Sequence, residues 1–244
     1  VEALVADPDV KGMWCVPKYS NPTGCTYSDE VVARIARLAP AAPDFRVYWD
    51  NAYCEHFLYP EGAAPLANVF DLCAKAGNPD LVYQFCSTSK ITFPGAGVSA
   101  MAASEANLAD LKGEYKHRMI GHDKLNQLRH VRFLRDVEGL RAHMAKQADI
   151  LRPRFELAEK RFTEGLGGLG IASWTHPRGG YFVSFDGLEG SAHAIFELCA
   201  ECGVTMTGAG AAFPYGMDPL DSNIRIAPSL PPLEELETAM EVLC

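Results

Sequence analysis

Short apolar segments alternate with helix-like patterns in the first part of the chain. Each apolar segment has the length of a strand and is bounded by turn-forming residues, which predicts buried strands. Because buried strands that alternate with helices are typical of a parallel sheet covered by helices, the pattern predicts an α/β fold. The predicted strands span residues 10–16, 45–49, 81–86 and 98–103.

Two helices are predicted between these strands. The first begins after Thr26 or Ser28, either of which can cap it, and ends before Pro40. Apolar residues at helical spacing give this helix one buried face. A second helix is predicted within residues 65–76. The predicted buried face of the first helix consists of Val31, Ile35 and Leu38.

The second part of the chain is first helical and then mixed. A long helix is predicted from about residue 122 to 148, with a kink or restart at Pro153 and a continuation to residue 166. Most of its Arg and His side chains are interpreted as a solvated face. The chain is therefore divided into two predicted domains, a larger one over 1–148 and a small α+β domain over 149–244. Beyond the long helix, strands are predicted at 171–174, 180–185 and 223–227, and helices at 191–202 and 233–243.

Charge and composition narrow the classes of partner. The 244 residues carry a formal net charge of −9 and have a pI near 5.3, which argues against nucleic acid or an anionic membrane as the main partner. No apolar run reaches the length of a membrane span, and the N-terminus lacks the regions of a signal peptide. We therefore expect a cytoplasmic protein without a membrane anchor, and the missing initiator Met suggests a fragment or a processed chain.

The chain contains eight cysteines, most of them within apolar patterns. In a chain of this length, they are expected to be reduced core residues of a cytoplasmic protein. Cys199 and Cys202 have the spacing of a metal-ligand pair, but a second pair is absent and they lie in a helical pattern. We therefore expect a structural role for both and no metal site.

Lys90 closely follows the predicted strand 81–86, directly after a run of hydroxyl residues. A Pro-Gly-rich segment follows it, so the lysine is expected on a tight loop. A lysine amine can form a Schiff base with an aldehyde, and pyridoxal 5'-phosphate (PLP) is the cofactor that uses lysine in this way. A solvated lysine on a surface loop explains this stretch equally well.

Other polar residues stand at comparable positions. Asn21 and Asp50 each follow a predicted strand, and Tyr53 is three residues beyond Asp50. Ligands of open α/β sheets bind beyond the carboxyl ends of the strands, so Asn21, Asp50 and Lys90 are expected to converge on one cleft. A carboxylate beside a pyridine nitrogen keeps that nitrogen protonated, and a tyrosine or asparagine side chain can hydrogen-bond the phenolic oxygen of PLP.

Five short motifs occur together and in order along the chain. In this combination the chain resembles the fold-type I PLP-dependent aminotransferases of class I/II, and the segment around Lys90 is similar to the MocR-like branch with alanine–glyoxylate and aspartate aminotransferases. The resemblance implies an α/β, aspartate aminotransferase-like PLP-dependent transferase fold: part of a large, mostly parallel-sheet domain plus a small α+β C-terminal domain. The motifs are Asn-Pro-Thr-Gly at 21–24, Asp-x-x-Tyr at 50–53, Ser-x-Ser-Lys at 87–90, Gly-Gly-x-Phe at 179–182 and Asn-x-Arg at 223–225.

The resemblance implies a role for each matching residue. Lys90 would form an aldimine with PLP and then carry the proton of the 1,3-transfer. Asp50 would pair with the pyridinium nitrogen, and Tyr53 and Asn21 would hydrogen-bond the phenolic oxygen. Arg225 would bind the α-carboxylate of the substrate through its planar fork, with Asn21 beside it.

The chain departs from the family pattern in two ways. The resemblance implies that it is the C-terminal portion of the family's subunit, whose earlier half would carry a glycine-rich phosphate loop and the aromatic residue that stacks on the cofactor ring. The arginine that usually contacts the phosphate after the lysine loop is absent, because residues 96–99 read Ala-Gly-Val-Ser. Ser87, helped by Ser89, is therefore expected to bind the phosphate, with backbone N–H groups from the earlier half.

The resemblance implies an aminotransferase that moves an amino group between an amino acid and a 2-oxo acid. Aspartate or glutamate is the first expectation for the amino acid, and a homodimer is the expected assembly. Two alternatives stay open. A PLP-dependent lyase or decarboxylase of the same fold uses the same motifs, and an aminotransferase-like effector domain of a transcription regulator would need a basic DNA-binding segment upstream.

Overall fold

The computed structural model describes residues 1–63, 65–118 and 120–244, which form two compact units. Each unit has its own hydrophobic core and is described by itself. Two short segments from the first part of the chain belong to unit 2, which the sequence analysis did not foresee. Unit 1 consists of Val1–Lys18, Thr26–Cys54 and Ala64–His143, and unit 2 consists of Tyr19–Cys25, Glu55–Ala63 and Met144–Cys244.

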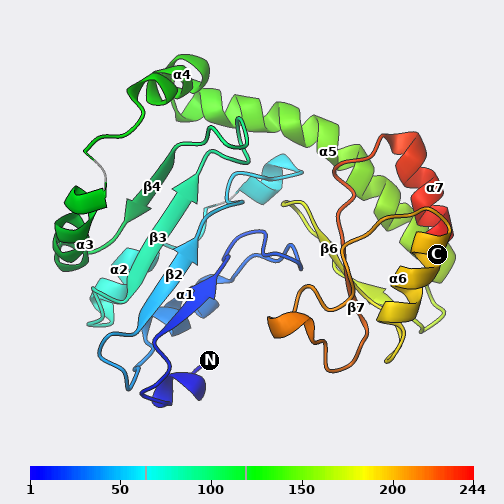
Figure 1. The fold of residues 1–244 in the computed structure, drawn as a ribbon, viewed down its shortest axis with the longest axis horizontal. Helices are drawn as coiled ribbons and strands as arrows, with labels where there is room; N and C mark the ends of the chain where they lie inside the picture. The colour runs from blue at the N-terminus through cyan, green and yellow to red at the C-terminus, as the bar shows by residue number, and fades with distance from the viewer. Residues whose placement is uncertain (64, 119) are drawn as a thin grey trace. The chain divides into compact units, whose positions relative to one another are not determined.

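Unit 1 is built on a four-stranded sheet in the order β1-β2-β3-β4 (Figure 1). The first three strands are parallel, and β4 is antiparallel to β3. All four predicted strands are therefore present, and the mostly parallel sheet confirms the α/β prediction. Their bounds are Gly12–Cys15 for β1, Arg46–Asp50 for β2, Val82–Ser87 for β3 and Ser99–Ala102 for β4.

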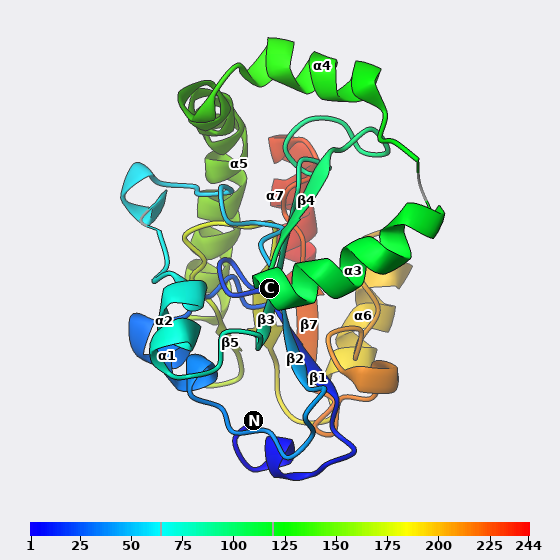
Figure 2. The same cartoon turned by 90° about the vertical axis from the view of Figure 1, so that its left-hand side faces the viewer.

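Helices α1 (Asp29–Ala36) and α2 (Val69–Lys75) lie on one face of this sheet (Figure 2). α1 begins after Ser28, whose hydroxyl accepts a hydrogen bond from the Val31 N–H at 3.2 Å, so the predicted cap is confirmed. The prediction that Val31 faces the core was wrong, because Val32 is 0% exposed and Val31 is 36% exposed. Counted from this cap, the positions that turn inward are Val32, Ile35 and Ala36.

The predicted long helix over 122–148 is two helices, α4 (Lys124–Leu134) and α5 (Val137–Leu166). The chain turns between them at Arg135, which has a φ of 65°. The Asp136 carboxylate then accepts a hydrogen bond from the Gly139 N–H at 2.7 Å, which caps the start of α5. Pro153 lies inside α5 without interrupting it. The remaining elements before α5 are the short helices η1 (Leu4–Ala6) and η2 (Pro60–Ala63) and the helix α3 (Glu105–Arg118).

Unit 2 contains a three-stranded antiparallel sheet in the order β5-β6-β7. The core joins this sheet to α5 and α7, because Phe155 and Phe162 of α5 and Met240 of α7 are buried in one cluster with Val183 and Ile224 of the sheet. The predicted α+β character of this part is confirmed. The elements are β5 (Ser173–Trp174), β6 (Val183–Asp186), α6 (Ala192–Glu201), η3 (Pro214–Gly216), β7 (Asn223–Ile226) and α7 (Leu233–Leu243).

All eight cysteines carry free thiols, but fewer are core residues than predicted. Cys15, Cys73 and Cys199 are buried, whereas most of the others are exposed. Among the residues that the structure describes, no helix is both long and apolar enough to cross a membrane.

Candidate active site

The end of β2 places Asp50 on the sheet face opposite α1 and α2. Val47 and Trp49 belong to the core beneath the helices, and side chains alternate along a strand, so Tyr48 and Asp50 point the other way. That face carries a row of aromatic rings, with Tyr48 and Phe85 stacked at 6.3 Å. Asp50 is the register partner of Phe85 on β3. The carboxylate therefore stands at the end of an aromatic surface.

Asp50 also acts on a buried thiol of the neighbouring strand. Burial raises the pKa of Cys15 from 9.0 to about 12, and the negative charge of Asp50 is the second cause. A charge acts in this way only over a short distance.

Lys90 and Tyr53 meet in unit 1. Tyr53 lies in the turn after Asp50 and is 6% exposed. The Nζ atom of Lys90 lies 4.9 Å from the centroid of the Tyr53 ring, which is the geometry of a cation over an aromatic face. Lys90 itself is exposed, so its amine is accessible to a ligand from solvent.

Lys90 lies within a single helical turn that begins at the end of β3. The N–H of Thr92 donates to the Thr88 carbonyl at 2.8 Å, and the loop is closed by the Thr88 N–H, which donates to the Val98 carbonyl at 2.9 Å. Gly97 passes so close to the turn that a Cβ there would lie 2.2 Å from the Ser89 hydroxyl and 2.9 Å from its backbone nitrogen. Only glycine fits, which explains the Gly-rich segment after the lysine.

Ser87 and Ser89 lie side by side before the lysine. Their Oγ atoms are 2.8 Å apart, and the Ser89 N–H donates to Ser87 Oγ at 3.1 Å. Both side chains are half-buried. The two hydroxyls face the same side as predicted, but through the start of the helical turn and not along an extended segment, and together they can donate to a shared oxyanion.

Three residues near the lysine loop were not predicted as part of the site. His130 of α4 is 9% exposed, and its Nε2 lies 2.8 Å from Thr88 Oγ1 and 2.8 Å from Thr92 Oγ1. Asn126 donates to the Ala96 carbonyl at 2.7 Å, and the His143 ring lies 2.8 Å from the Ile91 carbonyl. The interpretation of a solvated face, made for most of the Arg and His side chains of the long helix, does not apply to these two histidines. Their alternation with exposed arginines was the one available signal.

Asn21 lies in unit 2, in a tight turn. The Gly24 N–H donates to the Ser20 carbonyl at 2.6 Å. Gly24 has a φ of 66°, and a Cβ there would lie 2.3 Å from Cβ of Pro177, so this position requires glycine. The Asn-Pro-Thr-Gly motif thus serves to hold the asparagine side chain in place.

Arg225 lies in the middle of β7. Its neighbours Ile224 and Ile226 are buried in the unit 2 core, so its side chain projects from the opposite face of the sheet. There the guanidinium lies 4.6 Å from the Phe182 ring centroid, and Nη1 donates to Asn21 Oδ1 at 3.2 Å. The buried Nε has no hydrogen-bond partner among the residues that the structure describes. Such an unmatched donor is costly unless a ligand satisfies it.

The Gly-Gly-x-Phe motif explains how Phe182 reaches this position. A Cβ on Gly179 would lie 2.4 Å from the Tyr19 ring and 2.5 Å from the His56 carbonyl, and Gly180 has a φ of 82°. The two glycines let the chain pass flat against Tyr19. The Asn-x-Arg motif is partly structural too, because Asn223 is buried and donates to Ser184 Oγ at 2.8 Å.

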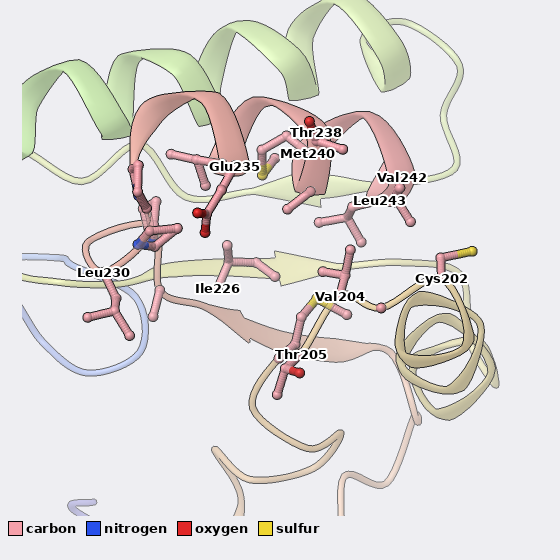
Figure 3. A pocket seen from close by; sticks show the side chains of 18 of the residues that line it. Cys202, Val204, Thr205, Ile226, Leu230, Glu235, Thr238, Met240, Val242 and Leu243 are labelled. Carbon is pink, nitrogen blue, oxygen red and sulfur yellow. The ribbon is translucent and has the colours of Figure 1, made fainter.

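Unit 2 also contains a cavity of about 910 Å³ between the segment after α6, the end of β7 and α7 (Figure 3). Ile226, Met240 and Leu243 point into it. Arg225 is the single basic side chain among the described residues that line it. A mainly apolar lining of this kind does not suit a phosphate, so we do not place the candidate cofactor site there.

The predicted site residues therefore fall into two groups. In unit 1, the Lys90 amine contacts the Tyr53 ring, and the hydroxyls of Ser87 and Ser89 contact each other. Asp50 ends the strand that precedes the turn with Tyr53. Unit 2 brings Arg225 onto Asn21. The expectation that all of them share one cleft stays a prediction.

Solved structures share this fold. An aspartate transaminase of Corynebacterium glutamicum is 47% identical, with a TM-score of 0.96, and the match covers 99% of this chain and 57% of that chain. An α-aminoadipate aminotransferase of Thermus thermophilus, solved with N-(5'-phosphopyridoxyl)-L-leucine, is 21% identical with a TM-score of 0.74, and the match covers 94% of this chain and 57% of that chain. The chain thus has the aspartate aminotransferase-like fold, as predicted.

Comparison of sequences gives the same answer at the level of the family. Residues 1–244 match the aspartate amino-transferase family, and the chain belongs to it. A protein of Mycolicibacterium smegmatis is 48% identical over 244 residues, and an aspartate aminotransferase of Corynebacterium glutamicum is 47% identical over 244 residues. These matches cover 100% and 99% of this chain but 57% and 56% of the two relatives, so the chain spans little more than half of their length.

Proposed function

We propose that the full-length polypeptide containing this chain is a PLP-dependent aminotransferase. The observation that carries the proposal is the position of Lys90, whose accessible amine lies over the ring of Tyr53 on a turn fixed by hydrogen bonds. Membership of the aspartate amino-transferase family supports the same activity.

The residues of unit 1 fit the cofactor. PLP needs an accessible lysine amine, an acid for its ring nitrogen and hydrogen-bond donors for its phosphate. Lys90, Asp50 and the pair Ser87 and Ser89 are of these kinds. The close approach of Gly97 to Ser89 leaves no space for a side chain beside the serine pair, so the loop backbone is shaped closely around these hydroxyls.

Each of these residues has an assigned task. When bound, PLP supplies an electron sink for the electron pair left at the α-carbon of the substrate. Lys90 would hold the cofactor, and its Nζ would then take the proton from the α-carbon and deliver it to the cofactor side of the 1,3-transfer. The Asp50 carboxylate would keep a proton at the ring nitrogen. Tyr53 and Asn21 would hydrogen-bond the ring oxygen, while Ser87 and Ser89 would donate to the phosphate.

Arg225 would bind the α-carboxylate of the amino acid and of the 2-oxo acid. The unmatched, buried Nε supports this role, because a carboxylate accepts from Nε and one Nη as a pair. Phe182 supports the guanidinium from one side. The contact with Asn21 Oδ1 occupies Nη1, so Nε and Nη2 are the donors left for the substrate.

The substrate and the assembly are part of the proposal. Aspartate or glutamate is the amino acid we propose first, supported by relatives named aspartate aminotransferase. We also propose a cytoplasmic homodimer. The eight free thiols support a reducing compartment.

The test is an assay of the full-length polypeptide with PLP, aspartate and 2-oxoglutarate, with alanine in place of aspartate as the comparison. We expect glutamate and the 2-oxo acid of aspartate in equal amounts, in a two-step cycle in which each half-reaction proceeds alone. Release of CO₂ or ammonia in place of a second amino acid would assign the fold to decarboxylase or lyase chemistry instead. DNA binding without turnover would favour the regulator.

A further inference from the structure

The inner face of α4 holds the lysine loop. We propose that His130 is a positioning residue: through Thr88 and Thr92 it fixes the helical turn that carries Lys90. The inference rests on the proposed function, because it concerns the lysine that would hold the cofactor. It concerns a side chain that the family motifs around Lys90 do not include.

The hydrogen bonds of His130 define its role. Nδ1 lies 2.9 Å from the Asn126 carbonyl, and a carbonyl can only accept, so Nδ1 carries a hydrogen. With its hydrogen on Nδ1, the ring has a single lone pair at Nε2, which accepts from one hydroxyl. Thr88 Oγ1 already accepts from the Val98 N–H at 2.8 Å, so its own hydrogen is available for Nε2. Thr92 Oγ1 lies at the same distance from Nε2 and donates its own hydrogen to the Thr88 carbonyl at 3.1 Å.

The two threonines flank Lys90 symmetrically, two residues before it and two residues after it. His130 therefore holds the start of the turn through the Thr88 hydroxyl and contacts its end at Thr92, whose hydroxyl donates to the Thr88 carbonyl. Lys90 is exposed and its own side chain does not anchor the backbone by burial. The position of its Cα depends instead on the turn, and a reacting amine must be held within a fraction of an ångström to be effective.

Two other contacts hold the same loop in place, and they limit how far it can move when the His130 ring is lost. Asn126, one turn before His130 on α4, donates to Ala96, and the His143 ring reaches the Ile91 carbonyl. Loss of the His130 ring should therefore loosen the turn without releasing the whole loop from α4. A small cavity of about 360 Å³ borders His130, Asn126 and Thr92, so the turn has room to move once the ring is removed.

Three variants of the full-length polypeptide test the proposal. His130→Ala removes the ring, and His130→Gln keeps an acceptor at the position of Nε2. Arg132→Ala, on the exposed side of the same helix, is the matched control. The first measurement is amide hydrogen exchange of residues 88–98 in protein without cofactor. We expect exchange about tenfold faster in His130→Ala, as for one lost hydrogen bond, and near-parent exchange in the other two variants.

The second measurement uses the protein loaded with PLP. His130→Ala should lower kcat about tenfold or more at nearly unchanged KM for the amino acid, because Lys90 and not the carboxylate site is misplaced. It should also shift the pH at which the absorbance of the bound cofactor changes. His130→Gln should restore most of both properties, a rescue that a merely structural role of the ring would not produce.

The outcomes separate the two proposals. Unchanged exchange over 88–98 in a folded His130→Ala protein overturns the positioning role, whatever the enzyme does. If α4 itself loosens in that variant, Thr88→Val removes the hydroxyl that donates to His130 from the loop side, and unchanged exchange there is equally decisive against the role. A parent protein without aminotransferase activity overturns the proposed function, while the exchange data still decide on the positioning role.

Discussion

The candidate site residues of unit 1 and those of unit 2 are two half-sites, and each is positioned by different structural means. In unit 1, Asp50 ends a strand and Lys90 lies on a turn beyond one, and side chains of other elements brace that turn. In unit 2, Arg225 lies within β7, where the ladder to β6 and the buried neighbours Ile224 and Ile226 fix its direction. Groups on loops depend on remote supports, whereas a group on a strand depends on the sheet itself.

This difference predicts where distant substitutions will act. Side chains of α4 and α5 form hydrogen bonds with the lysine turn. Substitutions on those helices should therefore change the turnover rate. The direction of the Arg225 side chain is set by the backbone pairing of β7 with β6. Side-chain substitutions elsewhere should hardly change that pairing. Changes at the half-site residues themselves should separate cofactor effects in unit 1 from substrate effects in unit 2.

The largest effect is expected for Lys90→Ala in the full-length polypeptide. Turnover should fall by about 10⁴-fold or more, because the group that carries the proton and holds the cofactor is lost. Borohydride treatment of the PLP-loaded parent, followed by peptide mapping, should place the label on the peptide that contains Lys90. A label on Lys112, Lys116 or Lys124 would move the assignment to another lysine of unit 1 and remove the lysine turn from the comparison.

Arg225→Lys tests the other half-site. Lysine keeps the charge but not the planar pair of donors, so kcat/KM should fall by about 10²-fold for every amino acid and 2-oxo acid alike. PLP affinity should stay that of the parent, as measured by titration. Arg178→Lys, an exposed arginine paired with Glu61 in the same unit, is the control. A loss confined to dicarboxylic substrates would place Arg225 at the side-chain carboxylate instead.

The serine pair should affect binding of the cofactor alone. Hydrogen bonds to a charged group contribute about 1.5–3 kcal/mol each, and Ser87 and Ser89 share one hydrogen bond between them. The double replacement by alanine should therefore raise the PLP dissociation constant by roughly 10- to 100-fold. Ser99→Ala, the exposed register partner of Ser87 on β4, serves as the control. Parent-like affinity of the double variant would mean that the phosphate is bound elsewhere.

The smallest effect concerns the thiol beside Asp50. The pKa of Cys15 is raised from 9.0 to about 12 in the folded protein, so the folded state keeps its proton while the unfolded chain loses it above pH 9. The free energy of unfolding should therefore fall between pH 9 and 12, by about 1.4 kcal/mol per pH unit at most. Denaturant melts at pH 8 and pH 10 should show a smaller decline in Cys15→Ala than in the parent. The exposed Cys86→Ala should decline like the parent, and an equal slope in all three proteins would contradict the argument.

Much of the fold could be predicted because its signals are local. Apolar runs between turn formers marked every strand, and Ser28 marked the start of α1. The break between α4 and α5 could not be predicted, because it occurs at Arg135 without glycine or proline and depends on the cap at Asp136. Val31 and Val32 are adjacent and equally apolar, so their residue types do not show which one is buried. The point at which the helix starts determines that Val32 faces the core.

The candidate site was predictable where a motif has a backbone reason. A Cβ would clash with another chain segment at three of the motif glycines, Gly24, Gly97 and Gly179. Such positions require glycine, and a required glycine can be recognised in the sequence. No comparable sequence signal identifies His130. It is one of three histidines in the arginine-rich segment 122–148, and only the fold shows that its ring turns toward Thr88 and Thr92.

The aromatic surface beside Asp50 has a consequence for handling the chain. Trp14 on β1 is 63% exposed and stacks on Tyr48 and Phe85, and β1 is an edge strand of its sheet. An uncovered strand edge next to exposed rings is a template for self-association. These 244 residues, if expressed alone, should bind hydrophobic dyes and form colloidal aggregates, in spite of their negative net charge.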